Sequence, residues 1–278
     1  MTRSSRSSRR AGFTLIELMV ALGVFLIICA VAFSLLGISQ QRYQTESQVM
    51  NSLEEARLAL DEIVRDVNDS GYPPPNQFSA APAANLYAST PFAWSSGSGY
   101  PGTPCQIGIA GGGTCSTASP SGPSPGDFDL IVETNINPQD AGSTVQWIRY
   151  QLQGTTLYRG MVPKVAGDDP DVDTLAATIM VPYVQNVMNN ASAAQIAQFQ
   201  ASYPTMFPGG TAVPIFSYIC ETATVPQPCP GAGSDNSPKN IRDVAVTLIV
   251  MAPSPDPQTG RPLLVELNGR ARRINPNL

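Results

Sequence analysis

A single carboxylate, Glu17, lies near the start of a long apolar stretch, residues 12–38. A charged carboxylate at the edge of hydrocarbon is costly unless it is paired with a cation or reaches the membrane interface. The next basic residue after it is Arg42, so a cation from the same chain must precede the stretch. The basic residues there are Arg3, Arg6, Arg9 and Arg10. Glu17 therefore indicates charge pairing at a membrane boundary.

The densest acidic cluster lies in residues 167–173 and contains Asp168, Asp169, Asp171 and Asp173. Carboxylates on alternate residues of a loop can hold calcium. The glycine and the closing glutamate of an EF-hand loop are missing, however, and this favours a solvated turn. We therefore predict that the chain has no metal site. The alternative is a calcium site formed by these four aspartates.

The chain contains no histidine. This excludes histidine-based acid–base catalysis, Ser-His-Asp and Cys-His arrangements, and the commonest zinc ligand. No other set of acid, base and nucleophile presents itself, so we predict no catalytic residues, no cofactor and no enzymatic activity. A membrane-tethered enzyme or ligand-binding protein stays the alternative, because scattered Asp and Glu side chains can pair in space.

A membrane helix is the first of the elements that must position Glu17. Residues 18–38 form a run of 21 residues without a charge, and a helix of that length covers roughly 31 Å, which matches one bilayer crossing. The arginines ahead of it predict a cytoplasmic amino terminus and a translocated carboxyl-terminal domain. The net charge is −5, and because the first twelve residues hold four arginines and no acid, the rest carries −9. A nucleic-acid-binding surface is not indicated.

The five cysteines divide into one apolar residue, Cys29 in the membrane run, and two local pairs. Cys105 with Cys115, and Cys220 with Cys229, are each close in sequence, and translocation places them in an oxidising compartment. They predict two disulfides, each of which stabilises by about 2.5–3 kcal/mol in the loop-entropy model. A metal site built from these four cysteines is the alternative, but no CxxC spacing supports it.

The sequence Gly12-Phe13-Thr14-Leu15-Ile16-Glu17 resembles the processing site of type IV prepilins and of type II secretion pseudopilins. The resemblance implies that a prepilin peptidase cuts between Gly12 and Phe13, and that the new amino terminus on Phe13 is N-methylated. Glu17 then becomes the fifth mature residue and sets subunit register by pairing with the Phe13 amine of a neighbour. The alternative is an uncleaved signal anchor whose Glu17 reaches the interface.

After the membrane run, the chain continues without proline to Asn68 and carries one apolar stripe. The spacing of 4, 3, 4, 3 and 4 residues places the stripe on one helix face, and it comprises Val49, Leu53, Ala56, Leu60, Ile63 and Val67. Asp61 and Arg65 are spaced as an i,i+4 pair, and the acidic residues, Asp66 included, are expected mostly off the buried face. Residues 69–73, with a glycine and a proline, predict the helix end. One helix is thus expected over residues 13–68, with a coiled-coil dimer as the alternative cover for its stripe.

The rest of the chain alternates loops and strands. Residues 73–126 are rich in Pro, Gly, Ser, Ala and Thr and predict a long loop. Strand patterns cover 128–133, 144–152, 156–162, 215–219, 241–252 and 263–274, with a short helix within 189–203. The predicted fold is α+β: a long amino-terminal helix packed on an antiparallel β-sheet, with long disulfide-bearing loops. The expected divisions are a leader, 1–12, a membrane or filament-core helix, 13–39, and a pilin-like globular domain, 40–278.

Two further segments resemble minor pilins of the PilW type. Arg65-Asp66 precedes Gly71-Tyr72 at the helix end, and the last strand carries the basic residues Arg270, Arg272 and Arg273. The resemblance implies a minor pilin that primes a type IV pilus and sits at or near its tip. Its partners would be other minor and major pilins, the prepilin peptidase/methyltransferase, the inner-membrane assembly platform and membrane lipid. It would cross the inner membrane once, with a periplasmic carboxyl-terminal domain, and then reach the pilus at the cell surface. A GspJ-like minor pseudopilin of a type II secretion system is the alternative, and the arginines can equally be solubilising charges on an edge strand.

Overall fold

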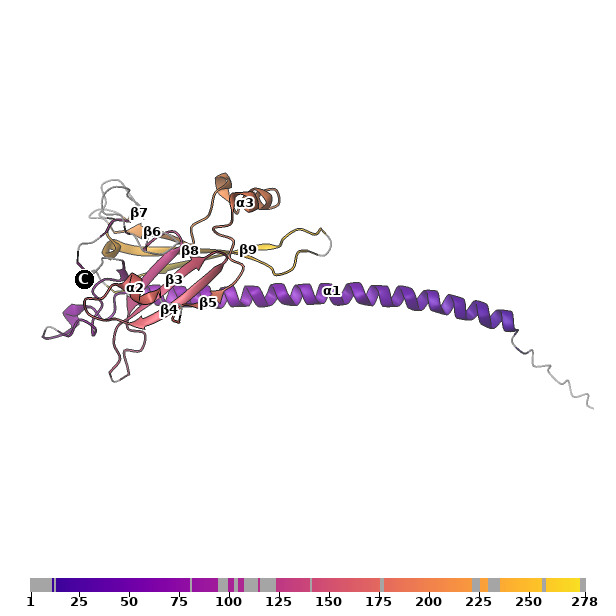
Figure 1. The fold of residues 1–278 in the computed structure, drawn as a ribbon, viewed down its shortest axis with the longest axis horizontal. Helices are drawn as coiled ribbons and strands as arrows, with labels where there is room; N and C mark the ends of the chain where they lie inside the picture. Colours follow the sequence, from indigo (N-terminus) through magenta and orange to yellow (C-terminus); the bar gives the residue numbers. More distant parts are fainter. Residues whose placement is uncertain are drawn as a thin grey trace, which may run out of the picture. The chain divides into compact units, whose positions relative to one another are not determined.

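The computed structural model describes residues 12, 14–80, 82–94, 100–102, 105–107, 115, 124–140, 142–175, 178–221, 226–229, 236–256 and 259–275. The chain divides into two compact units, Met1–Ser47 and Gln48–Leu278. Helix α1 (Leu15–Asn68) begins in the first unit and ends in the second, and the shorter helices are α2 (Pro170–Thr174) and α3 (Ala193–Gln200) (Figure 1). Single turns of 3₁₀ helix are η1 (Pro75–Gln77), η2 (Pro208–Gly210) and η3 (Pro238–Asn240).

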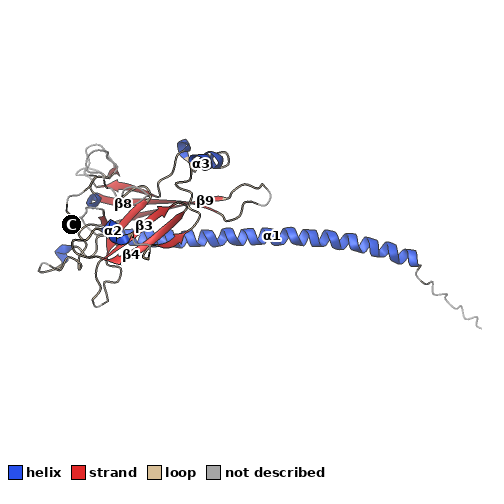
Figure 2. Ribbon diagram, in the orientation of Figure 1, coloured by secondary structure: helices blue, strands red, loops and turns tan. Residues whose placement is uncertain are grey.

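The strands of the second unit form two antiparallel sheets, where the sequence predicts one (Figure 2). The first sheet has the order β1-β2-β3-β4-β5 and the second the order β7-β6-β8-β9. Their bounds are β1 (Phe92–Ala93), β2 (Asp129–Thr134), β3 (Gln146–Gln153), β4 (Thr156–Pro163), β5 (Val181–Val184), β6 (Phe216–Cys220), β7 (Gln227–Cys229), β8 (Ile241–Met251) and β9 (Leu264–Arg272). The α+β class and the antiparallel pairing are confirmed.

The longer strands lie where alternation of apolar residues predicts them, and the short ones do not. The β3–β4 hairpin turns at Gly154, whose φ of 60° suits a residue without a side chain. Strands β1, β5 and β7 were not expected, because they have two, four and three residues and two of them contain a proline. Such segments are too short to show a period of two.

Helix α1 starts at Leu15, two residues later than the sequence predicts, because Thr14 acts as its cap. It ends at Asn68 as predicted. Gly71 then takes a φ of 79°, and its N–H donates to the main-chain oxygen of Glu133 at 2.8 Å. The carboxyl-terminal segment of the chain also contacts the helix end. The Asn275 carboxamide donates to the main-chain oxygens of Asp69 and Ser70, at 3.2 and 2.9 Å.

Residues 48–68 of α1 pack on both sheets, and most of the predicted stripe is buried. Ala56, Leu60, Ile63 and Val67 belong to the main core, whereas Val49 and Leu53 are half-buried. The core also holds alternate residues of the long strands, among them Leu130, Val132, Ile148, Tyr150, Val244, Val246 and Leu248. The helix thus forms the spine of the globular unit, and the coiled-coil alternative is not needed to cover its stripe.

Strand β9 lies against α1 and runs in the same direction. Val265 near its start shares a recess with Val49 and Leu53, and Arg272 at its end donates its main-chain N–H to the Asn68 side chain at 2.9 Å. Between them, a Cβ added at Gly269 would stand 2.8 Å from Leu60 Cδ1. Glycine at this position therefore lets the helix approach the sheet closely.

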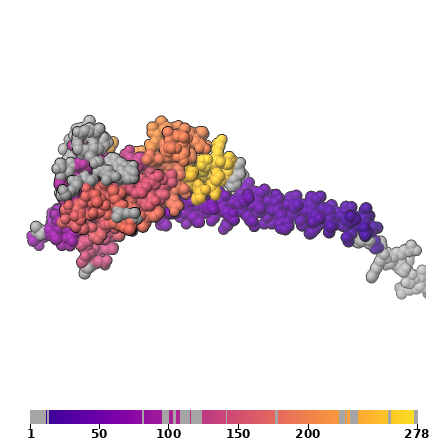
Figure 3. All heavy atoms as spheres, in the orientation of Figure 1, coloured from indigo at the N-terminus to yellow at the C-terminus, as the bar shows by residue number. Residues whose placement is uncertain are grey.

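A second, smaller apolar cluster covers the other face of β8. Ile249 packs there with Phe199 of α3 and with Phe207, whose ring stacks on that of Phe199 at 5.8 Å between centroids. Ser192 and Gln195 form a capping box that starts α3. Figure 3 shows the atoms around α3, in orange, gathered on one side of the globular unit.

Candidate assembly site

The start of α1 is held by a capping box that contains Glu17. The hydroxyl of Thr14 accepts a hydrogen bond from the N–H of Glu17 at 3.3 Å. In return, Glu17 Oε2 accepts from the N–H and from the hydroxyl of Thr14, at 3.1 and 3.0 Å. This is the S/T-x-x-E pattern, in which two helix-start donors are satisfied reciprocally. The Thr-Leu-Ile-Glu spacing thus has a local structural function in addition to any pairing between subunits.

Within the described residues, the capping box supplies the hydrogen bonds that Glu17 accepts. No ion pair to Glu17 occurs among the residues that the structure describes, and the leader arginines Arg3, Arg6, Arg9 and Arg10 lie outside them. The carboxylate instead accepts two hydrogen bonds from Thr14, which lowers the cost of placing it at the edge of hydrocarbon. It keeps free acceptor capacity, because a carboxylate has about four lone-pair sites.

The apolar side chains that follow Glu17 are exposed along the predicted membrane run, except for the half-buried Cys29. Leu18 and Phe33, for example, are 62% and 72% exposed. Among the described helices, α1 is the one long and apolar enough to cross a membrane, judged by length and composition. Of the two residues at the predicted cleavage junction, Gly12 is described and exposed, whereas Phe13 lies outside the described residues.

Residues 7–33 match the family model for the prokaryotic N-terminal methylation motif. The match supports a type IV pilin-like protein. It covers residues 7–12 of the predicted leader, the predicted cleavage junction, Glu17 and most of the predicted membrane run, and it leaves the globular unit uncovered. No curated protein and no solved structure is significantly similar to the chain.

The end of α1 contains a buried carboxylate, Asp66, that the sequence pattern places off the buried face. Only 1% of Asp66 is exposed, and its Oδ2 accepts from the Tyr150 hydroxyl at 2.7 Å and from Arg159 Nη2 at 3.1 Å. Arg159 also pairs with Glu62 at 3.1 Å, and the Tyr183 hydroxyl donates to Glu62. Burial raises the pKa of Tyr150 and keeps it a neutral donor. This cluster joins α1 to β3, β4 and β5.

Arg65 does not form the predicted pair with Asp61. Its guanidinium lies 3.6 Å from Glu62 and 3.8 Å from Asp66 instead. The burial of Asp66 accounts for this. Asp66 and Glu62, one turn before it, place their negative charges on the sheet side of the helix, and the Arg65 guanidinium turns toward them. Arg65 is exposed, so these contacts contribute little to stability.

The acidic cluster of residues 167–173 is divided between a helix cap and the core. Asp169 caps α2 by accepting from the Asp171 N–H at 3.0 Å, and Asp171 points inward to Arg149 at 2.7 Å. Asp168 is exposed and Asp173 is half-buried, with its pKa raised by burial and by the neighbouring aspartates. Among the described residues, no group of three or more His, Cys, Asp or Glu is placed to hold a metal ion. The four aspartates therefore do not converge on a calcium ion.

Arg149 is the fully buried centre of this arrangement. Its Nε and Nη2 donate to Asp129 at 3.0 and 2.5 Å, and its Nη1 donates to the Asp171 main-chain oxygen at 3.0 Å and to the Thr174 hydroxyl at 3.2 Å. Gln151 adds a donor to Asp129 at 2.7 Å. Burial raises the pKa of Asp129 to about 6, against the opposing effect of Arg149. The cluster fixes α2 on the outer face of β3.

A third buried cluster surrounds Glu133 on β2. Its Oε1 accepts from the Ser89 N–H and from Lys164 Nζ, both at 2.6 Å. Its Oε2 accepts from the Tyr100 hydroxyl at 2.6 Å and from Trp147 Nε1 at 3.2 Å. Burial raises the pKa of Tyr100, which therefore stays protonated and donates. Two of these four donors, Ser89 and Tyr100, lie in the long loop before β2, so the carboxylate attaches that loop to the sheet. None of these residues was singled out from the sequence.

The structure joins Cys105 to Cys115 and Cys220 to Cys229, the two pairs that the sequence predicts. The second pair lies across β6 and β7. Cys29 is a free cysteine in the apolar part of α1.

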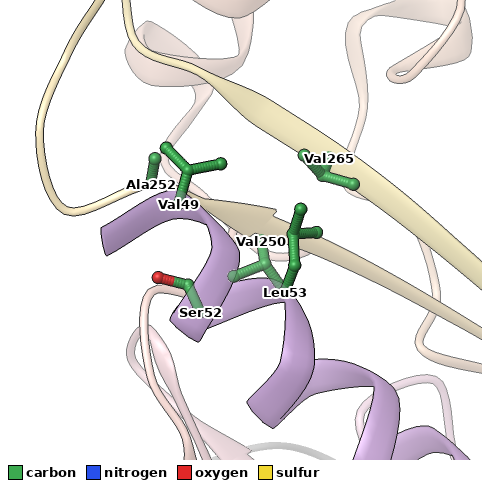
Figure 4. Close-up of a pocket in the computed structure, with 6 residues that line it drawn as sticks. All are labelled: Val49, Ser52, Leu53, Val250, Ala252 and Val265. Carbon is green, nitrogen blue, oxygen red and sulfur yellow. The ribbon is translucent and has the colours of Figure 1, made fainter. Parts of the chain in front are cut away.

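One recess in the globular unit is drawn in Figure 4, between α1 and the ends of β8 and β9. It is apolar and contains no titratable side chain, and its lining residues are Val49, Ser52, Leu53, Val250, Ala252 and Val265. The buried acids and bases described above are paired inside the core and do not line this recess.

Proposed function

We propose that the chain is a minor pilin of the PilW type, which primes assembly of a type IV pilus and sits at or near its tip. It acts by packing and not by turnover. The apolar first half of α1 anchors the chain in the inner membrane and then packs against the helices of other pilins. The Glu17 carboxylate meets the Phe13 amine of a neighbouring subunit and sets the axial register.

The observation that carries this proposal is the state of Glu17 at the start of an exposed apolar helix. Its carboxylate is held in position by Thr14 and keeps acceptor sites for one more donor. A charge-assisted hydrogen bond from an amine in low dielectric is strong, so a cationic terminus is the natural partner. The match of residues 7–33 to the methylation motif supports an amine at that place.

The first prediction concerns processing. Mass spectrometry of the protein extracted from membranes should show that the first twelve residues are absent and that Phe13 carries one methyl group on its nitrogen. The capping box leaves Gly12 outside the helix, where a peptidase can reach the backbone. A Gly12→Val variant serves as the control, because it should keep the leader. A wild-type chain with an intact leader would contradict the pilin mechanism.

The second prediction concerns the assembled structure. Deletion of the gene should strongly reduce the number of pili on the cell surface, because a priming subunit is needed at the start of each filament. Complementation with the wild-type chain should restore the count. Normal piliation together with a loss of protein secretion would instead identify a GspJ-like pseudopilin of a type II secretion system.

A further inference from the structure

The two sheets have four edges, and in the described structure only one of them is long and free of proline. Strand β1 has two residues, β5 contains Pro182, and β7 contains Pro228. Short strands and prolines are two of the means by which proteins prevent edge pairing. Strand β9 has nine residues and no proline, and it pairs on one side with β8. Its other edge lacks both of these protections.

The odd-numbered residues of β9 turn their main-chain groups toward β8. Beyond one end of the strand, the Arg273 N–H donates to the Arg242 oxygen at 3.0 Å. Before the other end, the Leu263 oxygen accepts from the Ala252 N–H at 2.8 Å. The register between these points is unbroken, so alternation along the strand holds throughout.

The even-numbered residues therefore face away from β8. At the ends of the strand they already have partners, because the Arg272 N–H donates to Asn68 Oδ1 at 2.9 Å and the Leu264 N–H donates to the Tyr203 hydroxyl at 3.4 Å. The residues between them have no main-chain partner on this side within the described structure. These open residues are Glu266, Asn268 and Arg270.

A second copy of the chain does not fit this edge. Two β9 edges related by a twofold axis would form an antiparallel ladder. Because residues 48–68 of α1 run parallel to β9, these segments of the two copies would then run in opposite directions, and their Gln48 ends would lie at opposite ends of the shared ladder. Strand β9 of one copy could also pair with a different edge strand of the next copy. The strands at those edges, β1, β5 and β7, are short or contain a proline, and this prevents such pairing.

We propose that the outer edge of β9 at residues 266–270 accepts an extended strand from a different pilin-like subunit, an inference that rests on the proposed function. The side chains beside this edge are one carboxylate, Glu266, and two exposed guanidinium groups, Arg270 and Arg272. Arg270 forms an ion pair with Asp243 at 2.7 Å, but the Arg270 side chain is 64% exposed. The added strand is therefore expected to carry a carboxylate opposite these arginines. Main-chain hydrogen bonds supply the affinity and this charge pair supplies the specificity.

The test uses Asn268→Pro in the full-length chain. Proline removes the outward N–H and no main-chain bond to β8. The exposed bond that the Asn268 side chain accepts from the Thr247 hydroxyl at 2.9 Å is lost in this variant and in the alanine control and contributes little, so the unfolding temperature in detergent should stay close to that of wild type. Recovery of the variant in filaments sheared from cells, at equal membrane abundance, should fall about tenfold. Asn268→Ala is the matched control and should be recovered like wild type, because it keeps the N–H.

Two outcomes would overturn this inference: wild-type recovery of Asn268→Pro, or an equal fall for Asn268→Ala, which would assign the effect to the side chain. Amide hydrogen exchange gives a second measurement should the proline variant fold poorly. The amides of residues 266, 268 and 270 should exchange at least about tenfold more slowly in filaments than in detergent, and unchanged exchange would overturn the inference. Glu17→Gln is measured alongside. If it too is recovered like wild type, the pilin function itself fails, whereas a fall for Glu17→Gln alone removes only the β9 proposal.

Discussion

Replacement of Arg149 by Met is expected to lower the free energy of unfolding by about 3–5 kcal/mol at neutral pH, because it leaves two buried carboxylates without their cation. Arg149, Asp129 and Asp171 are all fully buried. Methionine fills much of the same space, so the loss reports mainly the uncompensated charge. Chemical denaturation of the full-length chain in detergent, followed by tryptophan fluorescence, measures it.

Arg270→Met is the matched control. Arg270 also pairs with an aspartate at 2.7 Å, but the arginine side chain is 64% exposed. Asp243 is itself buried, with 8% of its side chain exposed, but water reaches the guanidinium end of the pair, so this variant should lose clearly less stability than Arg149→Met. Equal losses in the two variants would contradict the assignment of Arg149 as a buried structural cation.

The effect of Arg149→Met should depend on pH with a definite sign. Burial raises the pKa of Asp129 from 3.8 to about 6 in the folded chain. A raised carboxyl pKa contributes stability that is present below about pH 4 and is lost as the pH rises to about 6. Without Arg149, which opposes this shift, the pKa rises further and more stability is lost on ionisation. The destabilisation should therefore be larger at pH 7 than at pH 4, and a pH-independent loss would contradict the charge argument.

Glu17→Gln should keep the helix start and abolish most recruitment into filaments. Glutamine can replace glutamate in a capping box, so the bond from the Thr14 N–H persists. The variant loses the charge that would meet a neighbouring amine in low dielectric, where an unpaired partner costs several kcal/mol. Membrane abundance and leader removal should equal those of wild type, while co-purification with the other pilins should fall by at least about tenfold.

Thr14→Ala separates the two roles of Glu17. It removes the hydroxyl that caps α1 and keeps the charge, so it should weaken the helix start by about 1 kcal/mol and leave recruitment largely intact. The uncleaved-anchor alternative gives the opposite result for Glu17→Gln, because the loss of a carboxylate would leave function intact or improve insertion. Wild-type assembly of Glu17→Gln would therefore exclude the register mechanism for this subunit.

Local sequence determined the parts of the fold that depend on neighbours a few residues apart. The stripe from Ala56 to Val67 predicts a helix face, and the glycine and proline at Gly71 and Pro73 predict its end. The same holds for the hairpin at Gly154, for the two disulfides and for the position of Glu17 in an apolar run. Each of these features is set by chain periodicity or by loop closure over about ten residues, and both are visible in one sequence.

Only the tertiary structure decided which charges are buried. Asp66 is next to the apolar stripe and looks like a surface residue, but Tyr150 and Arg159 reach it from more than eighty residues away. In β3, Arg149 occupies a position that an alternating strand would expose, and α2 covers that face. The division into two sheets, the acidic loop turned inward through Asp171, and the open edge of β9 have the same origin. Whether a polar side chain is exposed to water or bound to a partner depends on which distant segment packs over it. The local spacing of apolar residues does not predict that segment.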